Sequence, residues 1–161
     1  MCGRLSIQAL QSRGGRRPDE PAIDAGVIEG IPARLRRAQP VFAETGGLHA
    51  AALCTLEGHP WIVREDVGRH NAVDKVVGSA FRAGRFPASD AILAVSGRVA
   101  YEIIQKATAA GVVAVVAVGA PSSLAVDAAR AAGLTLIGFT REGRFNIYAG
   151  RERVRLERAV R

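Results

Sequence analysis

The sequence predicts an α/β fold with a sheet covered by helices on both faces, which gives three layers. Residues 91–95 and 112–118 are continuously apolar, as is typical of strands buried on both sides. Each run is followed by turn residues and then by a helix-like stretch, at 101–110 and 124–132. This alternation is typical of parallel strands joined by helices. The 161 residues are enough for one substantial core.

The N-terminal part predicts little regular structure before its first long helix. A short helical turn is expected within residues 2–10, and the Gly-, Arg- and Pro-containing residues 11–30 predict a loop. Pro32 suits the first turn of a helix, so we expect a helix over 33–45, kinked at Pro40.

The middle and the C-terminal part supply the remaining elements. Residues 48–56 and 61–65 flank a four-residue turn and predict a hairpin. A helix is expected over 69–81, because Val73, Val76 and Val77 share one face. Two final strands are expected at 134–140 and 145–148.

Composition narrows the classes of function. The net charge of +7 favours anionic partners such as nucleotides, phosphorylated cofactors or acidic proteins. Nucleic-acid binding is disfavoured because aromatic residues do not interleave the basic ones. No apolar run reaches the roughly 18 residues of a membrane span, and no signal peptide is recognised. Two cysteines without CxxC or HxxxH spacing predict a cytoplasmic protein without a metal site.

Three domain-level segments are expected. Residues 1–32 form an N-terminal segment and flexible loop, and residues 33–150 form the sheet domain. Residues 151–161 hold five arginines against two glutamates and predict a basic helix or a tail.

Three strand-to-helix turns carry polar residues, at 66–71, 96–98 and 119–123. In a parallel sheet these turns meet at one edge, beside helix N-termini that attract anions. Arg69, Arg98 and the serine hydroxyls would line the resulting crevice, which suits phosphate or pyrophosphate.

The element order also matches the cytidine-deaminase-like architecture, with a helix, a hairpin and then strand–helix repeats. In those enzymes zinc lies between helix N-termini, held by His or Cys from one turn and two cysteines from the next. His70 lies near the first turn, but Ser96-Gly97-Arg98-Val99 at the second contains no cysteine. The pocket would then persist without its zinc.

Five motifs between Cys2 and about Tyr148 closely resemble the FdhD family, the formate dehydrogenase accessory sulfurtransferases. They occur in order along the chain. The motifs are Thr45-Gly46-Gly47-Leu48-His49-Ala50-Ala51-Ala52-Leu53, Glu65-Asp66-Val67-Gly68-Arg69-His70-Asn71-Ala72-Val73-Asp74-Lys75, Ser96-Gly97-Arg98 with Tyr101-Glu102, Gly119-Ala120-Pro121-Ser122-Ser123-Leu124-Ala125, and Gly143-Arg144-Phe145-Asn146-Ile147-Tyr148.

The resemblance implies that sulfur passes from a cysteine desulfurase persulfide to the molybdenum (or tungsten) bis-pyranopterin guanine dinucleotide cofactor of formate dehydrogenase. Such proteins carry a Cys-x-x-Cys motif on a mobile loop, and Cys2-Gly3-Arg4-Leu5-Ser6 matches its second cysteine and the residues after it. The first cysteine would precede Met1, so the chain is expected to be the C-terminal portion of such a protein. Cys2 is the expected sulfur-carrying residue, and Cys54 is expected to be buried and inert.

The cofactor is then a bound substrate, and its guanine dinucleotides would occupy the crevice. Arginines would neutralise phosphate, serines would donate hydrogen bonds, and Asp66 or Glu65 would accept from guanine. Two histidines would handle protons or bind near the molybdenum. The expected cofactor-binding residues are His49, Asp66, Arg69, His70, Asn71, Arg98, Ser122 and Ser123. Each also has a structural alternative as a helix cap or a solvated side chain.

The resemblance further implies a homodimer that binds the desulfurase and formate dehydrogenase. The composition predicts no membrane or nucleic-acid partner. Two other functions stay open. One is a chaperone that holds the cofactor and performs no sulfur transfer. The other is a zinc-dependent nucleobase deaminase, which the absent cysteines disfavour.

Overall fold

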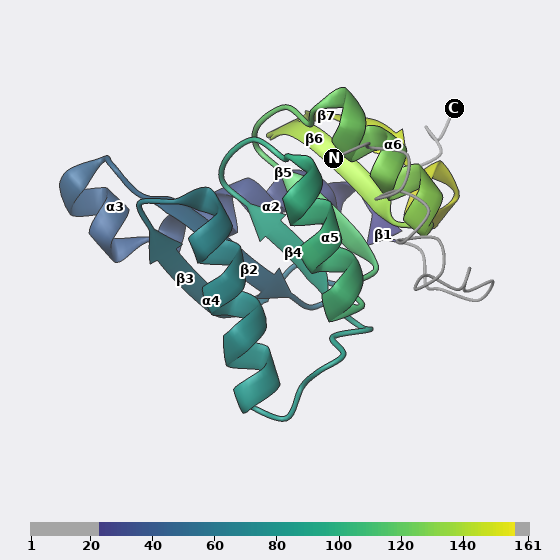
Figure 1. The fold of residues 1–161 in the computed structure, drawn as a ribbon. Coiled ribbons are helices and arrows are strands. Elements are labelled where there is room, and N and C mark those ends of the chain that lie inside the picture. The colour runs from purple at the N-terminus through teal and green to yellow at the C-terminus, as the bar shows by residue number, and fades with distance from the viewer. Residues whose placement is uncertain (1–22, 157–161) are drawn as a thin grey trace.

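A six-stranded mixed sheet forms the centre of the computed structural model, which describes residues 23–156 (Figure 1). The strand order is β3-β2-β4-β5-β6-β7. Strands β4, β5 and β6 run parallel, whereas β2 is antiparallel to both β3 and β4, and β7 is antiparallel to β6. The strands are β2 His49–Cys54, β3 Pro60–Asp66, β4 Ile92–Val95, β5 Ala114–Ala117, β6 Thr135–Arg141 and β7 Arg144–Ala149.

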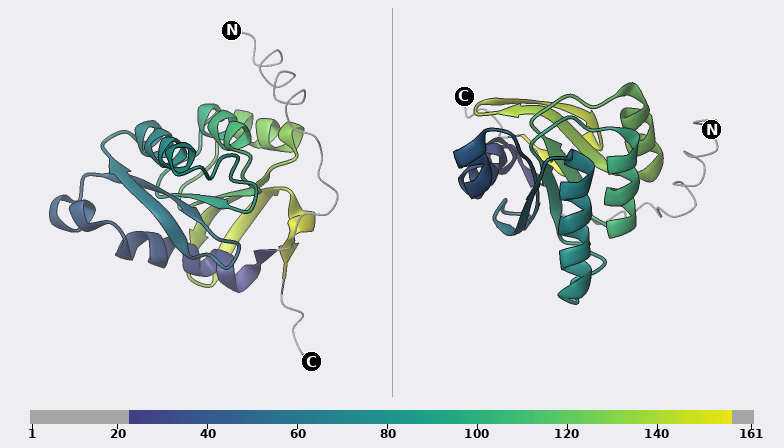
Figure 2. Two further views of the ribbon diagram at one scale, coloured as in Figure 1. Left: turned by 90° about the horizontal axis from the view of Figure 1, so that it is seen from below. Right: turned by 60° about the vertical axis from the view of Figure 1, so that its left-hand side comes forward.

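Helices cover both faces of this sheet, which confirms the predicted α/β arrangement (Figure 2). One face carries α4 Arg69–Arg82, α5 Tyr101–Ala110 and α6 Ser123–Ala132. The other face carries α2 Ala25–Arg37. The hairpin and every predicted element from residue 48 to residue 149 are confirmed within two residues. The further likeness to the cytidine-deaminase architecture stays a prediction.

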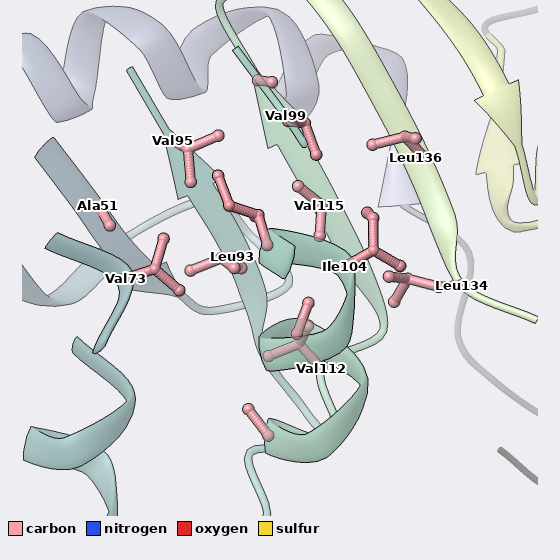
Figure 3. Close-up of a cluster of buried hydrophobic side chains, with 14 of the residues drawn as sticks. Ala51, Val73, Leu93, Val95, Val99, Ile104, Val112, Val115, Leu134 and Leu136 are labelled. Atoms are coloured by element: carbon pink, nitrogen blue, oxygen red, sulfur yellow. The ribbon is translucent and has the colours of Figure 1, made fainter. Parts of the chain in front are cut away.

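The core explains why the central strands are apolar throughout. Along β2, Ala51 and Leu53 pack against α4–α6, whereas Ala50 and Ala52 pack toward α2. Alternate side chains of a strand point to opposite faces, so a sheet covered twice needs apolar residues at every position. Figure 3 shows the cluster beneath α4 and α5, where Leu93 and Val115 of the central strands meet Val73 and Ile104 of the helices.

The predicted loop over 11–30 and the helix over 33–45 are wrong at their boundaries. Helix α2 already begins at Ala25 and contains Pro32, and a separate helix, α3 Pro40–Thr45, follows it. Ile28, Ile31 and Leu35 are buried against the sheet at helical spacing. Burying each of the three stabilises the fold by about 1.5–3 kcal/mol, so together they outweigh the roughly 3 kcal/mol that an interior proline costs.

The described part of the basic C-terminal segment forms neither a helix of the predicted kind nor a tail. Arg151–Arg153 forms a 3-10 turn, and β8 Val154–Arg155 pairs in parallel with β1 Ile23–Asp24. The Arg153 side chain is buried and donates from Nη1 to Thr135 Oγ1 at 3.3 Å. The turn predicted within residues 2–10 and the last residues, 157–161, lie outside the described part.

Candidate functional site

The three polar turns meet at one end of the sheet, as predicted. Strand β3 runs in the same direction as β4 and β5, because both β3 and β4 are antiparallel to β2. The turns after β4 and β5 are joined by backbone hydrogen bonds. Gly119 N donates to Gly97 O at 3.1 Å, Val99 N to Ala120 O at 3.1 Å, and Ser122 N to Val99 O at 2.9 Å.

Gly119 allows this close approach because it has no side chain. A Cβ atom built on Gly119 would lie 2.8 Å from three backbone atoms, namely N of Arg98 and C and O of Gly97. Real Cβ atoms essentially never come within 3.0 Å of such neighbours. The glycine therefore sets the spacing between the turns that carry Arg98 and Ser122.

A cavity of about 280 Å³ opens between these turns, and we call it the turn cavity. Arg69, from the first turn of α4, lines it together with the exposed Arg98 and Ser122. Arg69 Nε is buried and has no hydrogen-bond partner within residues 23–156. The other lining residues are Val99, Ala100, Ala120 and Pro121. Two arginines and the N-cap of α6 thus line one cavity, and this combination suits an anion.

Ser122 and Ser123 differ in the hydrogen-bonding groups that they can present to a ligand. Ser122 is the N-cap of α6, and its hydroxyl oxygen accepts from Ala125 N at 3.1 Å, while its proton remains able to donate. Ser123 is the exposed first residue of α6. Only Ser122 lines the turn cavity.

Glu65 and Asp66, at the end of β3, already bind groups of α3 and α4 respectively. Asp66 Oδ2 lies 2.6 Å from Lys75 Nζ, and its Oδ1 accepts from Gly68 N at 2.9 Å. The hydrogen bond from Lys75, followed by that from the Gly68 backbone, lowers the pKa of Asp66 to about 2. The Glu65 carboxylate accepts from the backbone N–H groups of Val41 and Phe42 at 3.0 and 2.8 Å, which ties down the start of α3. Neither carboxylate lines the turn cavity.

Three other predicted residues, His49, His70 and Asn71, do not line the turn cavity. His49 begins β2, and a Cβ built on Gly97 would lie 3.1 Å from its Nδ1 and 3.7 Å from Cδ of Arg69. His49 and Arg69 therefore both pack against Gly97. His70 accepts at its carbonyl from Lys106 Nζ at 3.4 Å, and Asn71 donates from Nδ2 to Asp66 Oδ1 at 3.2 Å.

A second cavity, of about 330 Å³, adjoins the same sheet end and was not predicted from the sequence. We call it the Gln39 cavity. Its walls are Arg36, Gln39, Phe42, Gly46, Gly47, Leu48, His49 and Ser96. The guanidinium carbon of Arg36 lies 3.8 Å from the centre of the Phe42 ring. Gln39 lies between α2 and α3, so the helical periodicity of the sequence did not point to it.

The two cysteines can be separated by their surroundings. Cys54 is a free thiol that is 2 % exposed, and burial, partly opposed by Arg34, raises its pKa to about 12. The prediction that Cys54 is buried is confirmed. Cys2 lies outside the described residues.

Metal clusters and membrane spans are both absent from residues 23–156. No group of three or more His, Cys, Asp and Glu side chains in this part could hold a metal ion. None of its helices combines the length and the apolar character needed to traverse a bilayer.

The chain belongs to the FdhD/NarQ family, whose model it matches over residues 1–155. It is 56 % identical over 163 aligned residues to the sulfur carrier protein FdhD of Anaeromyxobacter dehalogenans, covering 97 % of this chain and 56 % of that one. It is 49 % identical to the sulfur carrier protein FdhD of Streptomyces avermitilis, covering 99 % and 58 % respectively. The chain thus spans a little over half the length of these relatives.

A solved structure supports the same assignment. It comes from Desulfotalea psychrophila and is described as that of a formate dehydrogenase accessory protein. It superposes with a TM-score of 0.77 at 29 % identity, over 84 % of this chain and 60 % of that one.

Proposed function

We propose that this chain takes part in transferring sulfur to the molybdenum (or tungsten) bis-pyranopterin guanine dinucleotide cofactor of formate dehydrogenase. The observation that carries the proposal is the turn cavity, where Arg69, Arg98 and Ser122 converge beside a helix N-terminus. A diphosphate could accept hydrogen bonds from both guanidinium groups there. Family membership and the sulfur carrier relatives support the chemistry.

Sulfur transfer needs an accessible thiolate, and Cys54 is a poor candidate because it is buried with a raised pKa. We therefore assign the step to Cys2. Its thiolate attacks the outer sulfur of the desulfurase persulfide, the S–S bond of the donor breaks, and the donor cysteine leaves as a thiolate. The persulfide on Cys2 then carries the sulfur that the cofactor receives as substrate.

The wider setting belongs to the same proposal. The partners are a cysteine desulfurase, formate dehydrogenase and a second copy of the chain, in the cytoplasm. The hairpin followed by strand–helix units supports a cytidine-deaminase-like three-layer architecture. In that architecture the pocket now binds a nucleotide in place of zinc.

Calorimetric titration of the chain with GDP tests the binding part of the proposal. Arg98→Gln should weaken GDP binding about 10- to 100-fold, because hydrogen bonds to charged groups contribute roughly 1.5–3 kcal/mol. Arg82→Gln, an exposed arginine at the end of α4, is the matched control and should leave affinity unchanged. No measurable affinity of the unmodified chain for GDP would remove the proposed site.

Persulfide loading by a desulfurase tests the chemical part. Cys2→Ala should abolish both the persulfide, detected by mass spectrometry, and support of formate dehydrogenase activity. Cys54→Ala should retain both. If Cys2→Ala still supports the enzyme fully, the chain is a cofactor-holding chaperone.

A further inference from the structure

The side of the molecule formed by β3 and α4 carries a cavity that the proposed function does not use. Strand β3 is at one edge of the sheet, and α4 packs against it (Figure 1). A cavity of about 610 Å³ opens between the two elements, and we call it the α4–β3 groove. Its walls include Arg64 and Glu65 of β3 and Lys75, Gly78, Phe81 and Arg82 of α4.

Gly78 leaves this groove open in the middle of a helix. A glycine inside a helix is less favourable than alanine, because it loses more conformational entropy on folding. No close contact requires it here, since a Cβ atom built on Gly78 would meet nothing within 4 Å among the described residues. The missing side chain therefore leaves space on the surface of α4 that another molecule can fill.

Exposed aromatic rings border the same groove. Phe81 is 68 % exposed and lines the groove, and the exposed Phe86 packs edge-on against it with ring centres 5.7 Å apart. Nearby, the guanidinium carbon of Arg85 lies 3.6 Å from the centre of the Trp61 ring. Aromatic residues and arginine are enriched at protein interfaces, and adjacent exposed apolar side chains mark interaction sites.

The charge of the groove is positive, which indicates the kind of partner. Neither Arg64 nor Arg82 forms an ion pair within residues 23–156. Lys75 is paired with Asp66, and Glu65 accepts from backbone N–H groups of α3. A second copy docked here by a two-fold axis would bring like charges together, which is unfavourable. Acidic side chains would be complementary to the two arginines.

We propose that the α4–β3 groove docks an acidic segment of a partner protein. An apolar side chain of that segment lies over Gly78 and against Phe81, and its carboxylates bind Arg64 and Arg82. The α4–β3 groove and the turn cavity share no lining residue. Docking in the groove is therefore independent of what the turn cavity binds, and it goes beyond the proposed function.

Fluorescence anisotropy of the full chain with a labelled Glu-Leu-Glu-Leu-Glu-Leu peptide tests this inference. The peptide should bind, and a Lys-Leu peptide of the same length should not. The double variant Arg64→Gln/Arg82→Gln should weaken binding about tenfold, because each exposed ion pair contributes severalfold. The matched control is Arg36→Gln/Arg37→Gln, which removes two exposed arginines from α2 on the other face of the sheet and should leave the affinity unchanged.

A second variant fills the groove without changing its charge. Gly78→Leu should also weaken peptide binding by about tenfold or more, through steric exclusion of the apolar side chain. Gly26→Leu is its control, because Gly26 is an exposed glycine of α2 with nothing within 4 Å of an added Cβ. Circular dichroism melting should show that all the variants fold.

Sedimentation velocity of the same variants tests a second copy of the chain as the occupant. If the groove variants change the oligomeric state and leave peptide affinity unaltered, the groove is an interface between copies and the inference fails. It also fails if the acidic peptide does not bind, if the basic peptide binds equally well, or if the groove variants bind like their controls.

Discussion

Adding one methyl group at Gly119 should separate the two turns that build the turn cavity. In Gly119→Ala the new Cβ would lie 2.8 Å from backbone atoms of Gly97 and Arg98, about 0.6 Å short of the 3.4 Å where ordinary contact begins. Backbone cannot rotate away as a side chain can, so the turns must move apart. The movement displaces Arg98 and strains the hydrogen bond from Gly119 N to Gly97 O.

The expected cost follows from these contacts. Overpacking a tight site costs about 1–3 kcal/mol, and losing a backbone hydrogen bond costs about 1 kcal/mol more. We therefore expect Gly119→Ala to lower the free energy of unfolding by roughly 2–4 kcal/mol. Pyrophosphate affinity should fall as well, because the turn that carries Arg98 moves relative to Arg69, the other arginine that lines the turn cavity.

Gly78→Ala is the matched control, since it adds the same methyl group in α4, where nothing lies within 4 Å of the new atom. It should stabilise the chain by about 0.5–1 kcal/mol through helix propensity. Urea denaturation measures both changes, and calorimetry measures pyrophosphate binding. The spacing argument is refuted if Gly119→Ala unfolds at the same urea concentration as the parent and binds pyrophosphate equally well.

Three further predictions concern single groups. Burial raises the pKa of Cys54 to about 12, above the roughly 8.5 of an unfolded thiol. The free energy of unfolding should therefore fall by about 1.4 kcal/mol per pH unit between these two values. Urea denaturation at pH 8 and pH 10 should show this loss in the parent and not in Cys54→Ala. The pKa of Asp66 is lowered to about 2, so the stabilising effect of its carboxylate is complete above about pH 4 and is lost as the pH falls through 2. Lys75→Met should raise the pKa of Asp66 toward 3.8 in an NMR titration. An unchanged pKa would contradict the ion pair. Ser122→Ala removes the α6 cap and should cost about 1 kcal/mol in urea denaturation, a loss that Ser123→Ala should not reproduce.

Most of the fold could be predicted from the sequence because its signals are local. The apolar strands and Gly-terminated helices after residue 48 needed no tertiary information, and α5 was predicted to the residue. The N-terminal helix was misjudged because Pro32 is a local signal for a helix start, whereas burial of Ile28 and Ile31 against a distant sheet decides where α2 lies. Sequence periodicity does not reveal which face another element will cover.

The candidate site was predictable in part for the same reason. Strand direction alone placed Arg69, Arg98 and Ser122 at one edge, and all three line the turn cavity. Their role in binding the cofactor stays a prediction. The partners of Glu65 lie 23 and 24 residues away in sequence, so its engagement with α3 could not be foreseen.

The engagement of both β3 carboxylates has an electrostatic consequence for anything that approaches this end of the sheet. Lys75 balances the charge of Asp66 at short range, and Glu65, which accepts only from neutral backbone N–H groups, leaves one negative charge against the two positive charges of Arg69 and Arg98. An incoming diphosphate should experience net attraction before contact, and its association rate should decline as salt shortens the screening length from about 30 Å at 0.01 M to about 8 Å at 0.15 M.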